Sequence, residues 1–376
     1  MDRIDFRNKR QKEKFDSYIF NSSDGFIQQT TRWAEIASPI SGDMPVFLYE
    51  ENKDYFIGCS LYLFNSRLGN ILVSNIQAGS MGCITYKGED KYKNTAYEKL
   101  MEAIIFTARS NNCISITLTS NPFANDGNII EKYLKPEAGM KSFISIIKTK
   151  KFFNADGEVT LKKYNRSSNL SRNLKKAYHN SLEFYVEKKP QIFDEWYNNI
   201  HKERIYEIGG KPLPYKMLYD ILFHPKMEEF SKLFTIYKNG ILIGADLCVF
   251  NDNGIFDNFM PSTRKQYLDI GTNFFMIEQI LKWCYRNQIK IYNWQSSNPP
   301  KGGVFKFKQQ WGSEVLPYNY YTKIIDRERF EEVIRNKSLN TIRQVFEGHF
   351  FAPFHTVKKG IYGLKSKEEI NRIVES

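Results

Sequence analysis

Two acidic residues, Asp246 and Asp257, stand in apolar, strand-like segments and are the first candidates for chemistry. The segments on either side of the turn at 251–254 predict a β-hairpin. If Phe250 pairs with Ile255, the two carboxylates lie diagonally on one sheet face, about 7 to 8 Å apart. A buried carboxylate needs a cation, a hydrogen-bond donor or a bound ammonium group as its partner. The pair can therefore hold an amine and take its proton, and a salt bridge or a solvent-facing strand side is the structural alternative.

Other reactive residue types give weaker signals. His201, on a predicted helix, is a reserve base, although a single histidine on a helix is more often structural. No Gly-x-Ser-x-Gly elbow occurs, so nothing predicts a covalent acyl-serine intermediate. The cysteines are odd in number, widely spaced and set among apolar residues, which predicts reduced core thiols and no metal site. They are Cys59, Cys83, Cys113, Cys248 and Cys284.

Length and composition predict a folded, basic protein. The chain has 376 residues, of which 41% are apolar and 15% aromatic, so it can bury a large core. Fifty-four Lys and Arg residues against 42 Asp and Glu residues leave a net charge of +12. That excess favours anionic partners such as nucleotides, phosphates, nucleic acid or acidic surfaces, and charge alone does not choose among them.

The sequence shows no targeting or membrane-spanning segment. Its first 15 residues are too polar for a signal peptide, and no apolar run approaches the ~18 residues that a span requires. We therefore expect a soluble, cytoplasmic protein. Contact of the basic segments with an anionic membrane surface is the less favoured alternative.

One order of predicted elements occurs twice along the chain. The segments 47–64 and 234–250 each predict a strand, a polar turn, and a second strand that ends in Phe. The segments 99–122 and 276–299 align without a gap, each as a helix, a strand and a final Ser-Asn-Pro. Ser60 takes the place of Asp246 in this alignment. The shared order indicates two copies of one α/β module, although any two α/β units share some of these features.

The helix of the second copy begins at a glycine. An apolar stripe at helical spacing predicts that this helix packs on a sheet; the stripe is Ile270, Phe274, Ile277, Leu281 and Cys284. Gly271, Thr272 and Asn273 stand at its start, where backbone N–H groups can approach a pyrophosphate. A packing or turn glycine is the more common explanation. The first copy has no glycine there, which points to the second copy as the ligand-binding one.

A basic segment, 162–176, lies between the copies without an acidic residue. Leu170, Leu174 and Ala177 recur at helical spacing, so we expect an amphipathic helix with one basic face. That face is either plain solvated surface, a phosphate-steering surface or a nucleic-acid footprint. We expect domains at 1–155 and 156–325, the second of them catalytic. A helical tail, 326–376, should dock through Phe350, Phe351 and Phe354.

Three motifs in order resemble the tandem-GNAT acyltransferase family, which includes the Fem-type peptidyltransferases. They are FIQQTTRWAEI at 26–36, SSNLSRNLKKAYHNSLEF at 167–184, and IYNWQSSNPPKGGVFKFKQQWGSE at 291–314. The last motif contains the sequence Phe-Lys-Gln-Gln-Trp-Gly at 307–312, which is similar to the end of the family's motif. The resemblance spans about 26–321. It implies a mixed α/β fold with two GNAT-like domains, an acceptor site in a cleft between them, and acyl transfer to a primary amine.

The family has two branches, and departures from its motifs bear on the choice. Fem-type members take an aminoacyl group from tRNA, whereas other members take an acyl group from coenzyme A and acylate an amino sugar carried on a nucleotide. The stretch 191–223 is too short for the coiled-coil insertion of some Fem-type members. Ala37 and Ser38 follow Trp33 where Fem-type relatives tend to carry a lysine.

We therefore predict an N-acyltransferase that uses acyl-coenzyme A as cosubstrate and holds no permanent cofactor. Its predicted acceptor is a dTDP- or UDP-linked amino sugar in surface polysaccharide biosynthesis. The alternative is an aminoacyl-tRNA-dependent peptidyltransferase that builds peptidoglycan interpeptide bridges. Other acyltransferases stay open, as does a non-catalytic module that binds nucleic acid through the basic helix.

Individual residues can be given roles in this reaction. From the hairpin we hypothesise that Asp246 or Asp257 positions the acceptor amine and takes its proton, and the resemblance implies that a backbone N–H near 260–262 binds the oxyanion. Cationic side chains would contact the phosphates, and the alternative is that they belong to the solvated surface. Polar and aromatic side chains would contact the substrate, although a position in the core is more common for them. Together these side chains are Lys308, Lys306, Arg204, Trp294, Gln295 and Trp311.

Overall fold

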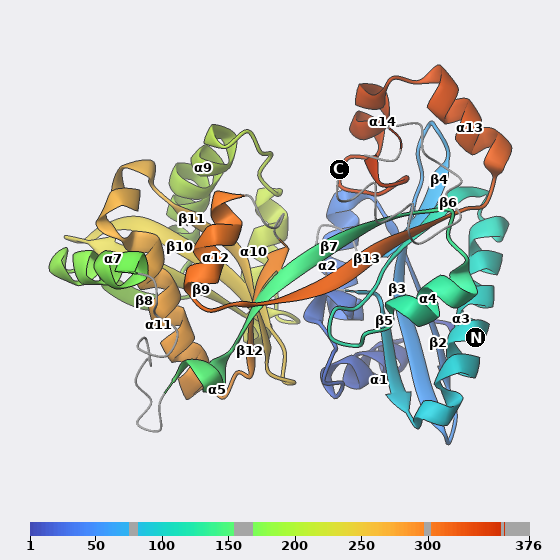
Figure 1. Cartoon of the computed structure of the whole chain (residues 1–376), viewed down its shortest axis with the longest axis horizontal. Coiled ribbons are helices and arrows are strands. Elements are labelled where there is room, and N and C mark those ends of the chain that lie inside the picture. Colours follow the sequence, from blue (N-terminus) through green and yellow to red (C-terminus); the bar gives the residue numbers. More distant parts are fainter. Residues whose placement is uncertain (75–81, 154–167, 297–301, 355–356, 358–376) are drawn as a thin grey trace. The chain divides into compact units, whose positions relative to one another are not determined.

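The computed structural model describes residues 1–74, 82–153, 168–296, 302–354 and 357. The chain forms two compact units, drawn in Figure 1: unit 1 is Met1–Phe143 with Leu316–Ser376, and unit 2 is Ile144–Val315. The sequence predicted divisions at 155/156 and 325/326, with a separate tail. In the structure the tail clusters with unit 1, and strands β7 (Ala138–Lys148) and β13 (Glu314–Ile324) carry the chain from one unit to the other.

Unit 1 is a mixed sheet with helices. Its strands follow the order β1-β2-β3-β4-β6-β13, and β5 also pairs with β3. The elements are β1 (Asp2–Arg3), α1 (Lys9–Phe20), η1 (Ile27–Gln29), α2 (Thr31–Ser41), β2 (Met44–Glu51), β3 (Tyr55–Phe64), β4 (Asn70–Ser74), β5 (Ile84–Gly88), α3 (Asp90–Ser110), β6 (Cys113–Thr119), α4 (Gly127–Leu134), α13 (Arg327–Asn336) and α14 (Leu339–Val345).

Unit 2 has the same kind of architecture. Its strands follow the order β7-β12-β11-β10-β9-β8. The elements are α5 (Thr149–Phe152), α7 (Ser168–His179), β8 (Glu183–Glu187), α8 (Pro190–Trp196), the π-helix η2 (Tyr197–His201), α9 (Lys202–Glu207), α10 (Tyr215–Phe223), η3 (Glu228–Phe230), β9 (Ser231–Lys238), β10 (Ile241–Phe250), β11 (Ile255–Thr263), η4 (Lys265–Ile270), α11 (Thr272–Arg286), β12 (Ile291–Ser296) and α12 (Gly303–Gln310).

The predicted repeat is visible in the strand pairing. In unit 1, β2, β3 and β4 are antiparallel neighbours, and after helix α3 strand β6 lies parallel to β4. In unit 2, β9, β10 and β11 are antiparallel neighbours, and after α11 strand β12 lies parallel to β11. Ser60 opposes Phe47 just as Asp246 opposes Phe234. The predicted α/β class and the two copies of one module are therefore confirmed.

Helices α7 and α11 bury their predicted apolar faces in the core of unit 2. Leu170, Leu174 and Ala177 of α7 belong to one buried cluster with Ile277 and Leu281 of α11. Ile270 and Phe274, at the start of the predicted stripe, are partly buried against the same cluster. All five cysteines are buried free thiols. No described helix has both the length and the apolar character that a membrane span requires.

The register of β10 on β11 differs from the predicted one. Phe250 pairs with Phe256, and Asp246 pairs with Pro261. Between the pairs Leu247↔Met260 and Val249↔Asp257, strand β11 has two residues where β10 has one. This is a β-bulge, and the extra residue changes which side chains share a face. The predicted diagonal pairing of Asp246 with Asp257 is therefore wrong.

The C-terminal tail docks on unit 1 as its aromatic residues predicted. The Ser115 hydroxyl donates to the Phe351 carbonyl oxygen at 2.8 Å, and the Thr117 hydroxyl to the Phe350 carbonyl oxygen at 2.9 Å. The buried Phe351 ring stacks on Phe330 with ring centroids 4.6 Å apart. Buried polar groups of β6 are thus satisfied by the tail.

Phe351→Ala should lower the free energy of unfolding by about 3 to 5 kcal/mol, because it removes a fully buried ring. The control is Phe354→Ala, at a half-buried position on the same segment, which should cost less. Urea unfolding followed by circular dichroism measures both variants. Equal losses in the two variants would show that the tail is not anchored through Phe351.

Candidate functional site

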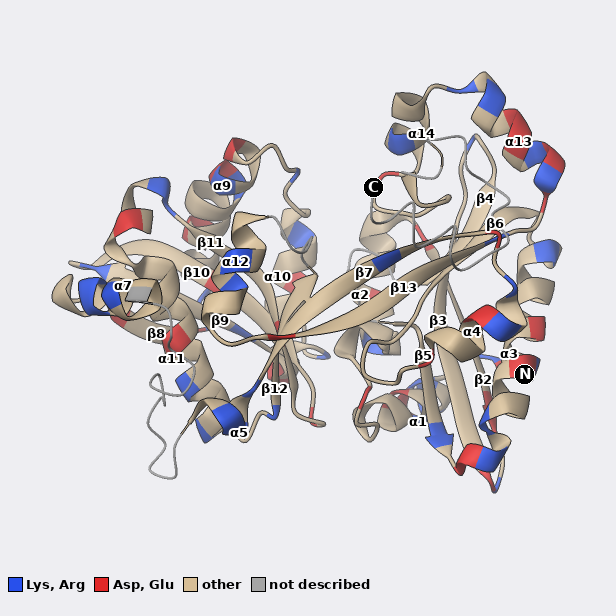
Figure 2. Ribbon diagram, in the orientation of Figure 1, with Lys and Arg blue, Asp and Glu red and all other residues tan. Residues whose placement is uncertain are grey.

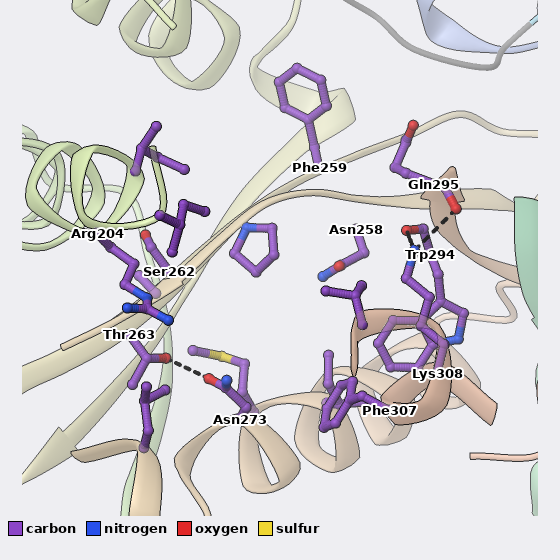
Figure 3. A pocket seen from close by; sticks show the side chains of 18 residues that line it. Arg204, Asn258, Phe259, Ser262, Thr263, Asn273, Trp294, Gln295, Phe307 and Lys308 are labelled. Atoms are coloured by element: carbon purple, nitrogen blue, oxygen red, sulfur yellow. Dashed lines mark hydrogen bonds between the residues drawn. The ribbon is translucent and has the colours of Figure 1, made fainter. Parts of the chain in front are cut away.

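A pocket opens in unit 2 where two parallel strands part. The last paired residues of β11 and β12 are Asp257 and Asn293. Beyond this point residues of both strands line a cavity of about 360 Å³, whose remaining walls come from β10, α9 and the residue after it, η4, α11 and α12 (Figure 3). Beyond Asp257 and Asn293, β12 therefore no longer pairs with β11, and side chains of both strands face the cavity.

The bulge in β11 sets the polar floor of this pocket. Asn258, in the bulge, lines the pocket, and its amide nitrogen donates to the buried Asp246 carboxylate. Asp246 itself is fully buried and does not reach the cavity. Burial raises the pKa of Asp246 to about 7, and weaker hydrogen bonds from Cys248 and the Met260 backbone oppose that shift.

The second predicted acid, Asp257, also lies behind the pocket wall. Its Oδ1 accepts from the Asn293 amide nitrogen at 2.7 Å, and the Asn293 amide oxygen accepts from the Gln295 backbone N–H at 3.0 Å. Gln295 lines the pocket with φ of +64°, a left-handed conformation that is costly for this residue. Asp246 thus holds the lining residue Asn258 directly. Asp257 holds the lining residue Gln295 by way of Asn293, and both arrangements suit positioning.

Lys308 holds the end of β12. Its Nζ donates to the carbonyl oxygens of Trp294 at 2.7 Å, Gln295 at 3.2 Å and Ser296 at 3.2 Å. These three bonds use all three donors of the ammonium group. Burial lowers the pKa of Lys308 to about 8. Lys308 lines the pocket, as predicted, but as arranged it keeps no donor free for a phosphate.

The other predicted binding residues fall into two groups. Arg204 and Trp294 line the pocket, and Arg204 is held by a 2.8 Å bond to Glu207. Trp311 is fully buried in the core behind the pocket, and Lys306 is exposed and does not line the pocket. Lys301, which also precedes Lys308, lies outside the described residues.

His201 reaches the pocket through a hydroxyl group. Ser262 lines the pocket, and its Oγ accepts from the Trp196 indole nitrogen at 2.8 Å. The same Oγ lies 3.4 Å from His201 Nδ1. Burial lowers the pKa of His201 to about 4, so the imidazole is neutral at pH 7. Since Ser262 already accepts from Trp196, its own proton is free to point toward His201 or toward a ligand.

Helix α7 packs against the start of α11. Gly271 has φ of +86°, and a Cβ there would overlap the backbone carbonyl oxygen of Asn173 in α7. The Thr272 hydroxyl donates to the Tyr267 carbonyl oxygen at 2.6 Å. Asn273 lines the pocket and accepts from the Thr263 hydroxyl at 2.7 Å. Close packing therefore accounts for the glycine, and of the three predicted cofactor residues only Asn273 lines this cavity.

Several pocket residues carried no usable signal in the sequence. Asn258 and Ser262 lie in strand β11, where no sequence motif distinguishes them from other strand residues. Only the bulge directs Asn258 toward Asp246. Met276, Ile277 and Phe307 form apolar walls and read in the sequence as ordinary core residues. Among the described lining residues there is no carboxylate, imidazole or thiol, and Arg204 and Lys308 are the cationic ones. Within the described part of the chain, no cluster of His, Cys, Asp and Glu could hold a metal ion.

The chain is similar in fold to several solved structures. FemX covers 89% of this chain and 100% of its own, with a TM-score of 0.66 and 11% identity. A conserved protein of unknown function from Bacteroides thetaiotaomicron covers 85% and 98%, with a TM-score of 0.53 and 10% identity. L-PGS from Bacillus licheniformis covers 89% and 95%, with a TM-score of 0.51 and 10% identity.

No protein-family model matches the sequence. No curated protein matches it either. At identities near 10% the structural likeness shows a shared fold. It confirms the predicted mixed α/β fold of two similar units in tandem, which is the fold shared with FemX.

Gly271→Ala should destabilise unit 2 by about 2 to 4 kcal/mol, because it adds a clash with α7 to the cost of a left-handed alanine. Gly240→Ala is the matched control: Gly240 has φ of +74° and nothing within 4 Å of its Cβ position. The control should lose about 1 to 2 kcal/mol. Urea unfolding measures both, and equal losses would contradict the packing explanation.

Asp246 should make the stability of the protein depend on pH. Its pKa in the folded state is raised to about 7 from 3.8, so folding binds a proton between these values. The stabilising contribution is present below pH 4 and is lost as pH rises through 7. Asp246→Asn should remove this dependence. Its size is a few kcal/mol of unfolding free energy, because a difference of one in pKa corresponds to about 1.4 kcal/mol.

Urea unfolding at pH 5 and pH 8 measures the effect. Relative to Asp246→Asn, the wild-type protein should be more stable at pH 5 than at pH 8. Asp252→Asn, at an exposed turn residue, is the control that should leave the pH dependence of the wild type unchanged. A wild-type and an Asp246→Asn curve that stay parallel would show that Asp246 does not titrate in this range.

Proposed function

We propose that this chain is an N-acyltransferase whose reaction takes place in the pocket of unit 2. The observation that carries the proposal is the end of β11–β12 pairing at Asp257 and Asn293, with the cavity beginning at that point. The polar side chains of Asn258 and Ser262, which line the pocket there, can donate to an acyl carbonyl oxygen and stabilise the negative charge that develops on it. The fold shared with FemX supports an acyl-transfer function and says nothing of the substrate.

The reaction joins an amine nitrogen to the carbonyl carbon of an activated acyl group. A carbon–nitrogen bond forms, the bond from that carbon to the carrier's sulfur or oxygen breaks, and one proton passes from nitrogen to the leaving group. Ser262 is the lining hydroxyl next to a neutral imidazole, so Ser262 with His201 can relay this proton. Asp246 and Asp257 then fix Asn258 and Gln295 through hydrogen bonds.

For the substrates we retain the assignment that the sequence favoured. The donor is acyl-coenzyme A, and the acceptor is the amino group of a dTDP- or UDP-linked sugar in surface polysaccharide biosynthesis. A cytoplasmic location, which the sequence predicted, is part of this proposal. The motif departures at Ala37 and Ser38 and the short stretch 191–223 support this branch.

Transfer of an aminoacyl group from tRNA into peptidoglycan bridges is the second candidate. Two observations favour it: the phosphate contacts expected at Gly271 and Lys308 are taken up by protein groups, and α7 carries an exposed basic face. Thermal denaturation with added ligand separates the candidates, because a ligand of the native state raises the melting temperature. Coenzyme A with a nucleotide sugar should do so for the first candidate, and tRNA alone for the second.

Val304→Trp should impair transfer by narrowing the pocket. Val304 lines the cavity from α12 but is 64% exposed, so a larger side chain can be accommodated without disturbing the core. We expect KM for the acyl donor to rise on the order of tenfold, which corresponds to about 1.4 kcal/mol of binding. Ile241→Trp, exposed at the start of β10 and away from the pocket lining, is the control. Unchanged kinetics in Val304→Trp would place the reaction elsewhere.

A further inference from the structure

Helix α7 presents a stripe of three cationic side chains and one histidine that the proposed reaction does not use. Arg172, Lys175, Lys176 and His179 follow one another at i, i+3, i+4 and i+7, so they share one helix face. All four are exposed, while the opposite face is buried in the core of unit 2. We call these four residues the α7 stripe. The neighbouring basic residues predicted at 162–166 lie outside the described part of the chain.

The stripe borders a hollow of about 650 Å³. Asn169 and Asn173 of α7 line it together with Leu268 and Asp269 of η4. Within the described residues, no acidic side chain forms an ion pair with Arg172, Lys175 or Lys176, whereas other lysines of unit 2 do have such partners. The positive charge of the stripe is therefore not neutralised, and it favours an anion at this place. Figure 2 shows the basic residues gathered on α7.

Hydrogen bonds and packing fix the stripe beside the proposed active-site pocket. The Asn169 amide donates to Gln310 Oε1 of α12 at 2.9 Å, and Arg172 donates to Asn169 Oδ1 at 2.8 Å. Asn173 packs on Gly271 at the start of α11. Helices α11 and α12 are walls of the pocket, and Leu268 lines both the pocket and the hollow. A ligand that fills the pocket can therefore extend past Leu268 onto the stripe.

We infer that the α7 stripe binds the phosphates of the carrier on which the acyl group arrives. This inference rests on the proposed function. A guanidinium fork and two ammonium groups suit phosphate oxygens. The exposed Asp269 carboxylate, across the hollow, repels phosphate but can accept from ribose hydroxyls, so the phosphates belong on the α7 side. Coenzyme A and the 3′ end of an RNA both supply this phosphate and ribose chemistry.

The test is neutralisation of the stripe in the full chain. The variant R172Q/K175Q/K176Q removes three positive charges from an exposed face, and R109Q/R286Q/K290Q removes three exposed charges that line neither cavity. The probes are coenzyme A, measured by calorimetry, and uncharged tRNA, measured by fluorescence anisotropy over a range of salt concentrations. Circular dichroism checks that both variants are folded.

Loss of affinity in the stripe variant relative to the control supports the inference, and the probe affected identifies the carrier. For coenzyme A we expect the dissociation constant to rise on the order of tenfold. For tRNA we expect the slope of log affinity against log salt to fall in magnitude by about 2 to 3, since three phosphate contacts are removed. Equal affinities in the two variants for both probes overturn the inference.

The kinetics of acyl transfer separate this result from the fate of the proposed function. If the stripe variant transfers acyl groups with wild-type KM and binds both probes normally, the stripe is not a carrier site and the proposed function stands. If the wild-type protein binds neither probe and transfers no acyl group, the proposed function and the inference fail together. If the wild-type protein transfers acyl groups and only the stripe variant has a raised KM for the donor, both hold.

Discussion

A single buried ammonium group determines the shape of the candidate site. The Nζ of Lys308 donates to three consecutive carbonyl oxygens at the end of β12, where that strand no longer pairs with β11 but still pairs with β7 at Ser296. These bonds satisfy three backbone carbonyl groups at the point where β12 stops pairing with β11. The gap between the strands, and with it the pocket, depends on this arrangement. An apolar side chain at position 308 could not replace it.

A second set of hydrogen bonds fixes the residues around the gap. The bulge in β11 directs Asn258 toward Asp246, and Asn293 links Asp257 to the strained backbone of Gln295. Both acids are buried, and each accepts a hydrogen bond from an asparagine amide. Conformational strain at Gln295 is tolerated because three groups hold its backbone in place: the Asn293 amide, the Lys308 ammonium and the strand before it.

The two copies of the module differ where these features are needed. In unit 1 the parallel strands stay together as far as Val73 and Thr117, and the hydroxyl groups of Ser74 and Thr119 then lie 3.1 Å apart. Ser60 stands where unit 2 has Asp246. The face of β6 in unit 1 also receives the C-terminal tail through Ser115 and Thr117. Among the described residues, unit 1 has hydroxyl pairs and the tail where unit 2 has a bulge and a buried acid.

Much of the fold was readable from the sequence, because apolar periodicity and turn residues report local burial directly. The two modules, the buried faces of α7 and α11, and the aromatic anchors of the tail all follow from such patterns. The candidate site could be predicted only in part. Five predicted residues line the pocket, but the sequence did not predict what each of them contacts; they are Arg204, Trp294, Gln295, Lys308 and Asn273. The register change at Asn258 requires knowing where a bulge falls. The partners of Lys308 and the neighbour of Gly271 come from chain segments far enough away that only folding brings them together. The sequence by itself thus determined which elements form, while the tertiary structure decided which polar groups remain free, because hydrogen bonds between distant segments use some donors and leave others for a ligand.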